Sequence, residues 1–227
     1  MYDQVKNFYK SIDNDTNHRF KSWEHCFNYF LKPREEIEVD KACLHLSFYL
    51  ASWGMYRGSS YLLQKDYLIH KKLIEEIILN EKYKRLQTWN FIGNNEENIK
   101  ILFELDGKIK EYYKKEIIQI NGENKEVNVS HILSTKIILG TFGCVPAYDR
   151  FFISGLKLKD KNFGITFNPE NFANLITVYK DNSETIDKLS NEHHFYEHNY
   201  PIMKIIDMYF WQLGFEASSK KSTEAES

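Results

Sequence analysis

Four side chains that can carry charge or move a proton stand among apolar or glycine-rich neighbours: Arg57, His70, Lys136 and Asp149. A guanidinium binds carboxylates and phosphates through paired hydrogen bonds. A desolvated lysine can act as a base or a nucleophile, and a carboxylate stabilises positive charge that develops in a reaction. Because burying such groups singly is costly, we expect the four side chains to meet in one polar pocket.

Each of the four residues also has a purely structural explanation, and both explanations stay open at this point. Arg57 can pair with an acid at the edge of the core, and His70 can be a hydrogen-bonded core residue. The stem of Lys136 can run along apolar surface while its ammonium reaches water. Asp149 can cap the backbone amides of the helix that it opens.

The elements that must position these residues are helices, because apolar residues recur at spacings of three and four and strand-like alternation is scarce. Ser130 has the side chain of a helix N-cap, and Pro146 suits the first turn of a helix. The expected helices are residues 41–60 for Arg57, 66–79 for His70, 130–139 for Lys136 and the segment opened by Pro146 for Asp149.

The same periodicity predicts an all-α fold, a single bundle-like domain of about nine helices over residues 1–215. Asn121-Gly122 is typical of a hairpin turn, so one short hairpin is expected there. Residues 216–227 contain little that could anchor them to a core, and we expect a disordered tail.

Composition narrows the class of protein. The chain has 227 residues, a formal charge of −2 and 42% hydrophobic residues, which argues against extensive disorder. No apolar run reaches the roughly 18 residues of a membrane span, and no secretory signal precedes the first helix, so a cytoplasmic protein is expected. Three widely spaced cysteines predict neither a disulfide framework nor a zinc ribbon. Motifs for nucleotide hydrolysis and for dinucleotide binding are absent, and no cofactor is expected.

Two basic segments alternate with aromatic residues, a composition suited to a surface that follows a nucleic-acid backbone and stacks on bases. The alternative is an ordinary solvated face, because Glu75, Glu76 and Glu81 interrupt the first segment. The basic residues are Lys65, Lys71, Lys72, Lys82, Lys84 and Arg85 in the first segment and Lys157, Lys159 and Lys161 in the second.

The segment HFYEH at 194–198 matches the H-x-x-E-H pattern of a zinc peptidase, in which two histidines one helical turn apart bind the metal. Such a site needs a further acidic ligand downstream, and Pro201 ends the expected helix at once. Helix-end histidines are the alternative explanation, so a zinc-dependent hydrolase ranks third among the functional hypotheses and no metal ligand is assigned.

Three stretches, LHLSFYLASWGMYRGSSYLLQKDYLIH, ILSTKIILGTFGCVPAYDRFF and PIMKIIDMYFWQLGF, resemble a group of uncharacterised bacterial all-helical proteins. More remotely, the helical layout resembles the helix-hairpin-helix DNA glycosylases. That family uses a lysine in or beside the hairpin and an aspartate at the start of the following helix, positions that Lys136 and Asp149 would take. The family's L-P-G-x-G hairpin is replaced in this chain by Gly140-Thr141-Phe142-Gly143.

The second resemblance implies a DNA-acting enzyme, a nucleobase glycosylase in repair or in defence against foreign DNA. Asp149 and Lys136 would be catalytic, and an extruded base would need an aromatic pocket. The expected substrate-binding residues are Arg57, Trp53, Tyr56, His70 and Tyr148. The alternative is a helical module that binds nucleic acid or protein without chemistry.

Overall fold

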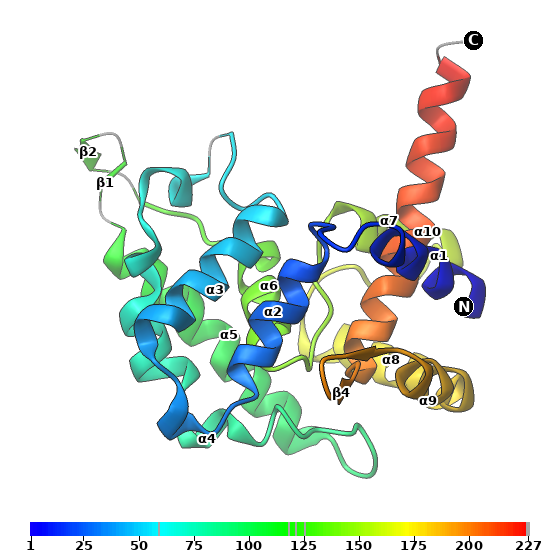
Figure 1. The fold of residues 1–227 in the computed structure, drawn as a ribbon, viewed down its shortest axis with the longest axis horizontal. Helices are drawn as coiled ribbons and strands as arrows, with labels where there is room; N and C mark the ends of the chain where they lie inside the picture. The colour runs from blue at the N-terminus through cyan, green and yellow to red at the C-terminus, as the bar shows by residue number, and fades with distance from the viewer. Residues whose placement is uncertain (59, 118, 121, 125, 226–227) are drawn as a thin grey trace. The chain divides into compact units, whose positions relative to one another are not determined.

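The computed structural model describes residues 1–58, 60–117, 119–120, 122–124 and 126–225, with the side chains of the last helix described as far as Lys220. The described chain is all-α, as the sequence predicts, with two very short hairpins beside the helices (Figure 1). Its contacts divide it into a terminal unit, Met1–His18 with Val145–Ser227, and a central unit, Arg19–Cys144. The single domain expected over residues 1–215 stays a prediction.

The central unit is built around one fully buried helix, α6 (His131–Thr141). Every residue from Leu133 to Thr141 is buried, and α6 packs against α2, α3 and α5. The Trp23 indole donates a hydrogen bond to the Leu139 carbonyl at 3.0 Å. The helices of this unit are α2 (Lys21–Phe30), η1 (Arg34–Glu36), α3 (Val39–Ser52), η2 (Tyr61–Gln64), η3 (Tyr67–His70), η4 (Leu73–Ile78), α4 (Glu81–Lys84), α5 (Glu96–Glu116) and α6.

The terminal unit is organised around α10 (Ile202–Ala225), which packs against α7 (Arg150–Lys159) and α1 (Tyr2–Asp13). Gly155 on α7 faces the Phe210 backbone of α10, so the two helices cross with backbone nearly touching backbone. The remaining elements of this unit are α8 (Pro169–Asp181), α9 (Ser183–Glu192), β3 (His194–Phe195) and β4 (His198–Asn199).

The expected short hairpin is present in the central unit. Strands β1 (Gln119–Ile120) and β2 (Glu123–Asn124) pair antiparallel, with Ile120 opposite Glu123. Gly122 has a φ of +81°, the left-handed conformation that the turn requires, and Asn121 lies outside the described residues.

Several expected helix boundaries differ from the structure. The helix expected to reach residue 60 ends at Ser52, because Gly54 takes a φ of +78° and turns the chain away. The helix expected at 66–79 is a 3-10 turn, η3, followed by the π-helix η4. The helix expected to open at Pro146 begins at Arg150, with Asp149 as its N-cap.

The expected disordered tail is helical through Ala225 in the structure, and residues 226–227 lie outside the described part. Side-chain hydrogen bonds within α10 support this extension: Gln212 donates to Glu216 at 2.9 Å, and Ser219 donates to the Phe215 carbonyl at 3.1 Å. The residues from Glu216 onward include alanine, lysine and glutamate, which favour helix without contact to a core.

Candidate functional site

Lys136 is the most buried cation that the sequence singled out. It lies on α6, which begins at the N-cap Ser130, whose hydroxyl accepts a hydrogen bond from the Leu133 amide. Only 2% of Lys136 is exposed, so its stem does not carry the ammonium out to water. The structure therefore supports the prediction that this lysine is buried and not the alternative of a snorkelling surface side chain.

The Lys136 ammonium lies at one end of a series of cations and aromatic rings within the central unit. Its Nζ atom is 5.1 Å from the centre of the Trp53 ring, and Trp53 stacks on Phe20 with ring centres 4.8 Å apart. The exposed Arg19 guanidinium lies 5.6 Å from the Phe20 ring centre. Such contacts stabilise a desolvated cation by about 2 kcal/mol. The Trp53 ring, expected to contact a base, is thus already contacted by Phe20 and Lys136.

Arg57 lies on the surface of the central unit, and the prediction that it shares a buried helical stripe is wrong. It follows Gly54 in the loop after α3, and its guanidinium folds back over that glycine. A Cβ atom at Gly54 would lie 2.9 Å from the Arg57 Nε atom, a contact that the flexible arginine side chain can relieve, so glycine is favoured there by its positive φ. The exposed guanidinium is placed to bind a phosphate or carboxylate from solution.

His70 is completely buried and hydrogen-bonded at both ring nitrogens. Its Nδ1 atom is 2.6 Å from the Tyr113 hydroxyl, and its Nε2 atom is 2.8 Å from the Tyr56 hydroxyl. The Tyr56 hydroxyl also donates to the Ser47 hydroxyl at 3.4 Å. Burial lowers the pKa of His70 to about 3, so the imidazole is neutral at pH 7, with one nitrogen donating and the other accepting. This arrangement fits the structural explanation of a satisfied core histidine.

We expect His70 to make the chain less stable in mild acid. Its pKa falls from 6.5 in the unfolded chain to about 3 in the folded one, so the unfolded state binds the extra proton first. Below pH 6.5 the free energy of unfolding should therefore decrease, at a slope approaching about 1.4 kcal/mol per pH unit from this group. Urea unfolding between pH 7 and pH 4.5 measures the slope. His70→Gln keeps polar atoms without titrating, and an equal slope in that variant contradicts the prediction.

Asp149 and Tyr148 lie in the terminal unit. The Asp149 Oδ1 atom accepts hydrogen bonds from the Phe151 and Phe152 amides, each at 3.1 Å, so the capping explanation holds. Tyr148 is 2% exposed and packs on the Phe167 ring with centres 4.9 Å apart. Burial raises the pKa of the Tyr148 hydroxyl, which therefore stays protonated.

Sequence reasoning missed a second buried charge cluster, on α10. The Lys204 ammonium and the Asp207 carboxylate are 2.8 Å apart, and both residues are 2% exposed. The other Asp207 oxygen accepts a hydrogen bond from the Ala147 amide at 2.9 Å, two residues before Asp149. Opposite charges three residues apart inside the apolar run PIMKIIDMYF were the available signal. Asp207 thus holds the loop that leads to the Asp149 cap.

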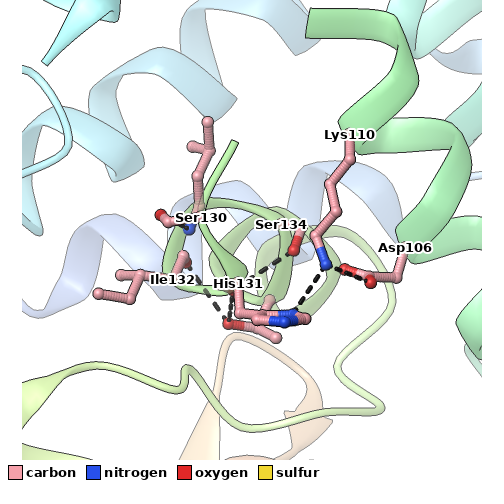
Figure 2. A network of polar contacts seen from close by, with 8 residues as sticks. Asp106, Lys110, Ser130, His131, Ile132 and Ser134 are labelled. Carbon is pink, nitrogen blue, oxygen red and sulfur yellow. Dashed lines mark hydrogen bonds and ion pairs between the residues drawn. The ribbon is translucent and has the colours of Figure 1, made fainter. Parts of the chain in front are cut away.

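A third polar network joins α5 to the start of α6 in the central unit (Figure 2). The Lys110 ammonium is 2.6 Å from Asp106 Oδ2 and 2.8 Å from His131 Nδ1. Hydroxyl groups of Ser134 and Thr135 donate to the His131 carbonyl. Burial and the nearby Lys110 charge lower the pKa of His131, so its ring accepts from the lysine. The i,i+4 spacing of Asp106 and Lys110 was the only sequence signal for this network.

Four of the six cations of the first basic segment form ion pairs in the structure. These four bind glutamates of the same unit, as expected of an ordinary solvated face. The pairs are Lys72–Glu116, Lys82–Glu104, Lys84–Glu81 and Arg85–Glu97. In the second segment, Lys157, Lys159 and Lys161 are exposed.

The histidines of HFYEH lie on a hairpin and not on a helix. α9 ends at Glu192, and His194 and His198 belong to separate antiparallel strands, β3 and β4. The helical spacing that the zinc motif needs is therefore missing. Across the residues that the structure describes, no three histidine, cysteine or acidic side chains gather as metal ligands.

The four residues expected to share a pocket have different surroundings. The contacts of His70 are with Tyr56 and Tyr113, the guanidinium of Arg57 is at the surface, and Lys136 lies against Trp53. Asp149 belongs to the terminal unit, and its meeting with the other three stays a prediction.

The fold and these clusters define an all-α protein with a lysine buried in its central unit and an aspartate that caps a helix of its terminal unit. Comparisons with protein-family models, curated proteins and solved structures gave no match. In the described part of the chain, no helix is both long and apolar enough to cross a membrane.

Proposed function

We propose that this chain is a DNA-acting enzyme that breaks the N-glycosidic bond between a nucleobase and its sugar. The observation that carries the proposal is the burial of Lys136, whose amine is held on α6 against an indole ring and away from water. A desolvated amine of this kind suits nucleophilic catalysis. The role would be repair or defence against foreign DNA in a bacterial cytoplasm.

Asp149 would supply the charge that the reaction needs. As the bond between base and sugar breaks, positive charge develops on the sugar, and a nearby carboxylate stabilises it. Its place as the N-cap of α7 supports the likeness to glycosylases, whose aspartate stands at the start of a helix. In the hydrolytic reaction, water adds its hydroxyl group to the sugar carbon, and its proton leaves with the base.

Lys136 has two possible roles, which an experiment can separate. In one, it assists the departing base by donating a proton. In the other, its neutral amine attacks the sugar carbon, and the base departs with the bonding electrons and takes up a proton. The sugar ring then opens as the bond between that carbon and the ring oxygen breaks, which leaves an imine between lysine and sugar. Borohydride reduces that imine to a stable covalent adduct. The adduct should therefore form only if lysine is the nucleophile.

The exposed Arg57 supports the proposal from the DNA side. Its guanidinium lies in a loop whose glycines, Gly54 and Gly58, both have positive φ, and a loop of this kind allows close approach of a phosphate. The exposed Lys157, Lys159 and Lys161 would add salt-dependent contacts to the DNA backbone.

The test is incubation with duplex oligonucleotides that carry deaminated, oxidised or alkylated bases, followed by alkali to cleave abasic sites. Asp149→Asn should lower the cleavage rate by about 100-fold or more, because it removes the charge. Asparagine is as good an N-cap as aspartate, so the fold should be unchanged. Asp66→Asn is the matched control, since Asp66 caps η3 by a hydrogen bond to the Leu68 amide. It should leave cleavage unaltered.

A non-catalytic DNA-binding module gives a different result in the same assay. It would retain DNA in a salt-dependent way, produce no alkali-labile sites, and bind equally well after Asp149→Asn. That outcome would contradict the proposal that the chain is an enzyme. Cleavage that survives Asp149→Asn would instead remove the assigned role of the carboxylate.

A further inference from the structure

The terminal unit contains a cleft whose lining includes neither Asp149 nor Lys136. Its volume is about 670 Å³, which lies in the range of clefts that bind small molecules. The end of α7 and the following residues 160–164 form one wall, and α8 forms another. Tyr209 and Phe210 of α10 complete the lining.

The α8 wall presents three polar groups from one face of the helix. Asn174, Thr177 and Asp181 are separated by three and four residues, so their side chains follow one another along the cleft. Neither Asn174 nor Asp181 is hydrogen-bonded to another residue in the described chain, and both are exposed. The amide of Asn174 and the carboxylate of Asp181 are therefore available to a ligand along this wall. The Thr177 hydroxyl donates to the Ala173 carbonyl at 3.3 Å and can still accept a hydrogen bond.

Tyr209 adds a phenol to the lining from α10. The residue is 6% exposed, and its hydroxyl makes no hydrogen bond within the described residues. The hydroxyl is open to the cleft, so a ligand there can bond to it in place of water. Burial raises the pKa of Tyr209, and the hydroxyl therefore remains a donor at neutral pH.

The opposite wall adds an aromatic surface and a mixture of charges. Phe163 is half-buried in the lining, where its ring can cover an apolar face of a ligand. Lys159 and Asp160 carry opposite charges, and Asp160 already accepts a hydrogen bond from the Asn162 amide at 2.8 Å. With Asp181 and the α-amino group of Met1, which also lines the cleft, the lining carries two positive and two negative charges, a balance that suits a neutral ligand.

We propose that this cleft binds a neutral ligand with several hydroxyl groups and one apolar face, that is, a monosaccharide or the sugar of a nucleoside. Hydroxyl groups both donate and accept, so they can bond to the amide of Asn174, the carboxylate of Asp181 and the phenol of Tyr209 together. A flat apolar face of the sugar or the base packs on the Phe163 ring. The proposal uses only the terminal unit and does not depend on the proposed reaction with DNA.

The experiment uses the full chain and neutral probes at millimolar concentration. Saturation-transfer difference NMR with methyl glucoside, methyl galactoside, ribose, uridine and adenosine detects binding and separates free sugars from nucleosides. At least one probe should bind. Tyr209→Phe, which removes only the hydroxyl, and Asn174→Ala should each weaken that binding about threefold to tenfold, the effect of one hydrogen bond.

Tyr179→Phe is the matched control on the same helix as Asn174. Its hydroxyl bonds to Asp187 at 3.3 Å and lies outside the cleft lining, so its loss should leave ligand affinity unchanged. Circular dichroism and melting temperature establish that each variant is folded. Spermidine and inorganic phosphate serve as charged comparison probes. The proposal is overturned if no neutral probe binds, if only a charged probe binds, or if Tyr209→Phe and Asn174→Ala bind the neutral probe as tightly as the parent chain.

Discussion

Replacing Gly155 with alanine is expected to destabilise the terminal unit by about 3 kcal/mol or more, because overpacking against backbone cannot be relieved by a side-chain rotation. A Cβ atom at this position would overlap the Phe210 carbonyl oxygen and lie 2.7 Å from its carbon. Gly214 has the reciprocal relation, with a Cβ atom 2.8 Å from the Phe151 carbonyl carbon. To accommodate either methyl group, α7 and α10 must separate.

Gly107→Ala is the matched control. Gly107 is also in a helix, α5, but no atom lies within 4 Å of the position of an added Cβ atom. Alanine there should stabilise the chain by about 0.5–1 kcal/mol, because it favours helix over the unfolded state. Urea unfolding and the melting temperature of the three proteins measure both effects. A Gly155→Ala variant as stable as the parent would contradict the close helix crossing.

Asp207→Ala is expected to be destabilising by about 3–5 kcal/mol, the usual effect of breaking a buried ion pair by removing one partner. The change takes the carboxylate away from the Lys204 ammonium at 2.8 Å and from the Ala147 amide at 2.9 Å. Both residues of the pair are 2% exposed, so water replaces neither interaction well. Urea unfolding of the variant measures the loss.

Two comparisons separate the buried pair from a general effect of charge removal. Lys204→Met combined with Asp207→Ala should be less destabilising than the sum of the single variants, and this difference gives the coupling energy. Glu38→Ala removes an acid from an exposed pair with Lys41 at the same i,i+3 spacing and should have no measurable effect. If the losses in unfolding free energy of the two single variants simply add in the double variant, Lys204 and Asp207 stabilise the unit independently.

The candidate site was only partly predictable from sequence. Helical spacing placed Lys136 and His70 on buried faces, and both residues are buried. It placed Arg57 on a buried face as well, which is wrong, because the spacing continues through Gly54 although the helix does not. A glycine inside a helical pattern is compatible with either outcome, and only the tertiary contacts select the turn.

Tertiary packing is the reason that the helix expected at residues 66–79 does not form as predicted. At residues 66–79 the local pattern is helical, but packing against α3 and α5 selects a 3-10 turn and a π-helix. Intrinsic propensity differs by less than 1 kcal/mol per residue between ordinary side chains, so tertiary packing readily overrides it.

By itself, the sequence determined the all-α class, the N-cap at Ser130 and the hairpin around Gly122, whereas the structure decided between the buried and the surface-reaching Lys136. The class, the cap and the hairpin depend on the spacing of apolar residues and on the chemistry of single turns and helix caps. Both are set by residues that are close together in the sequence. Only the tertiary structure decided that Lys204 pairs with Asp207, that Asp207 holds Ala147, and that Tyr209 faces a cleft. Those features depend on which faces of distant segments pack together. The free energy that selects one arrangement comes from this packing, and it is not visible in the sequence of any single segment.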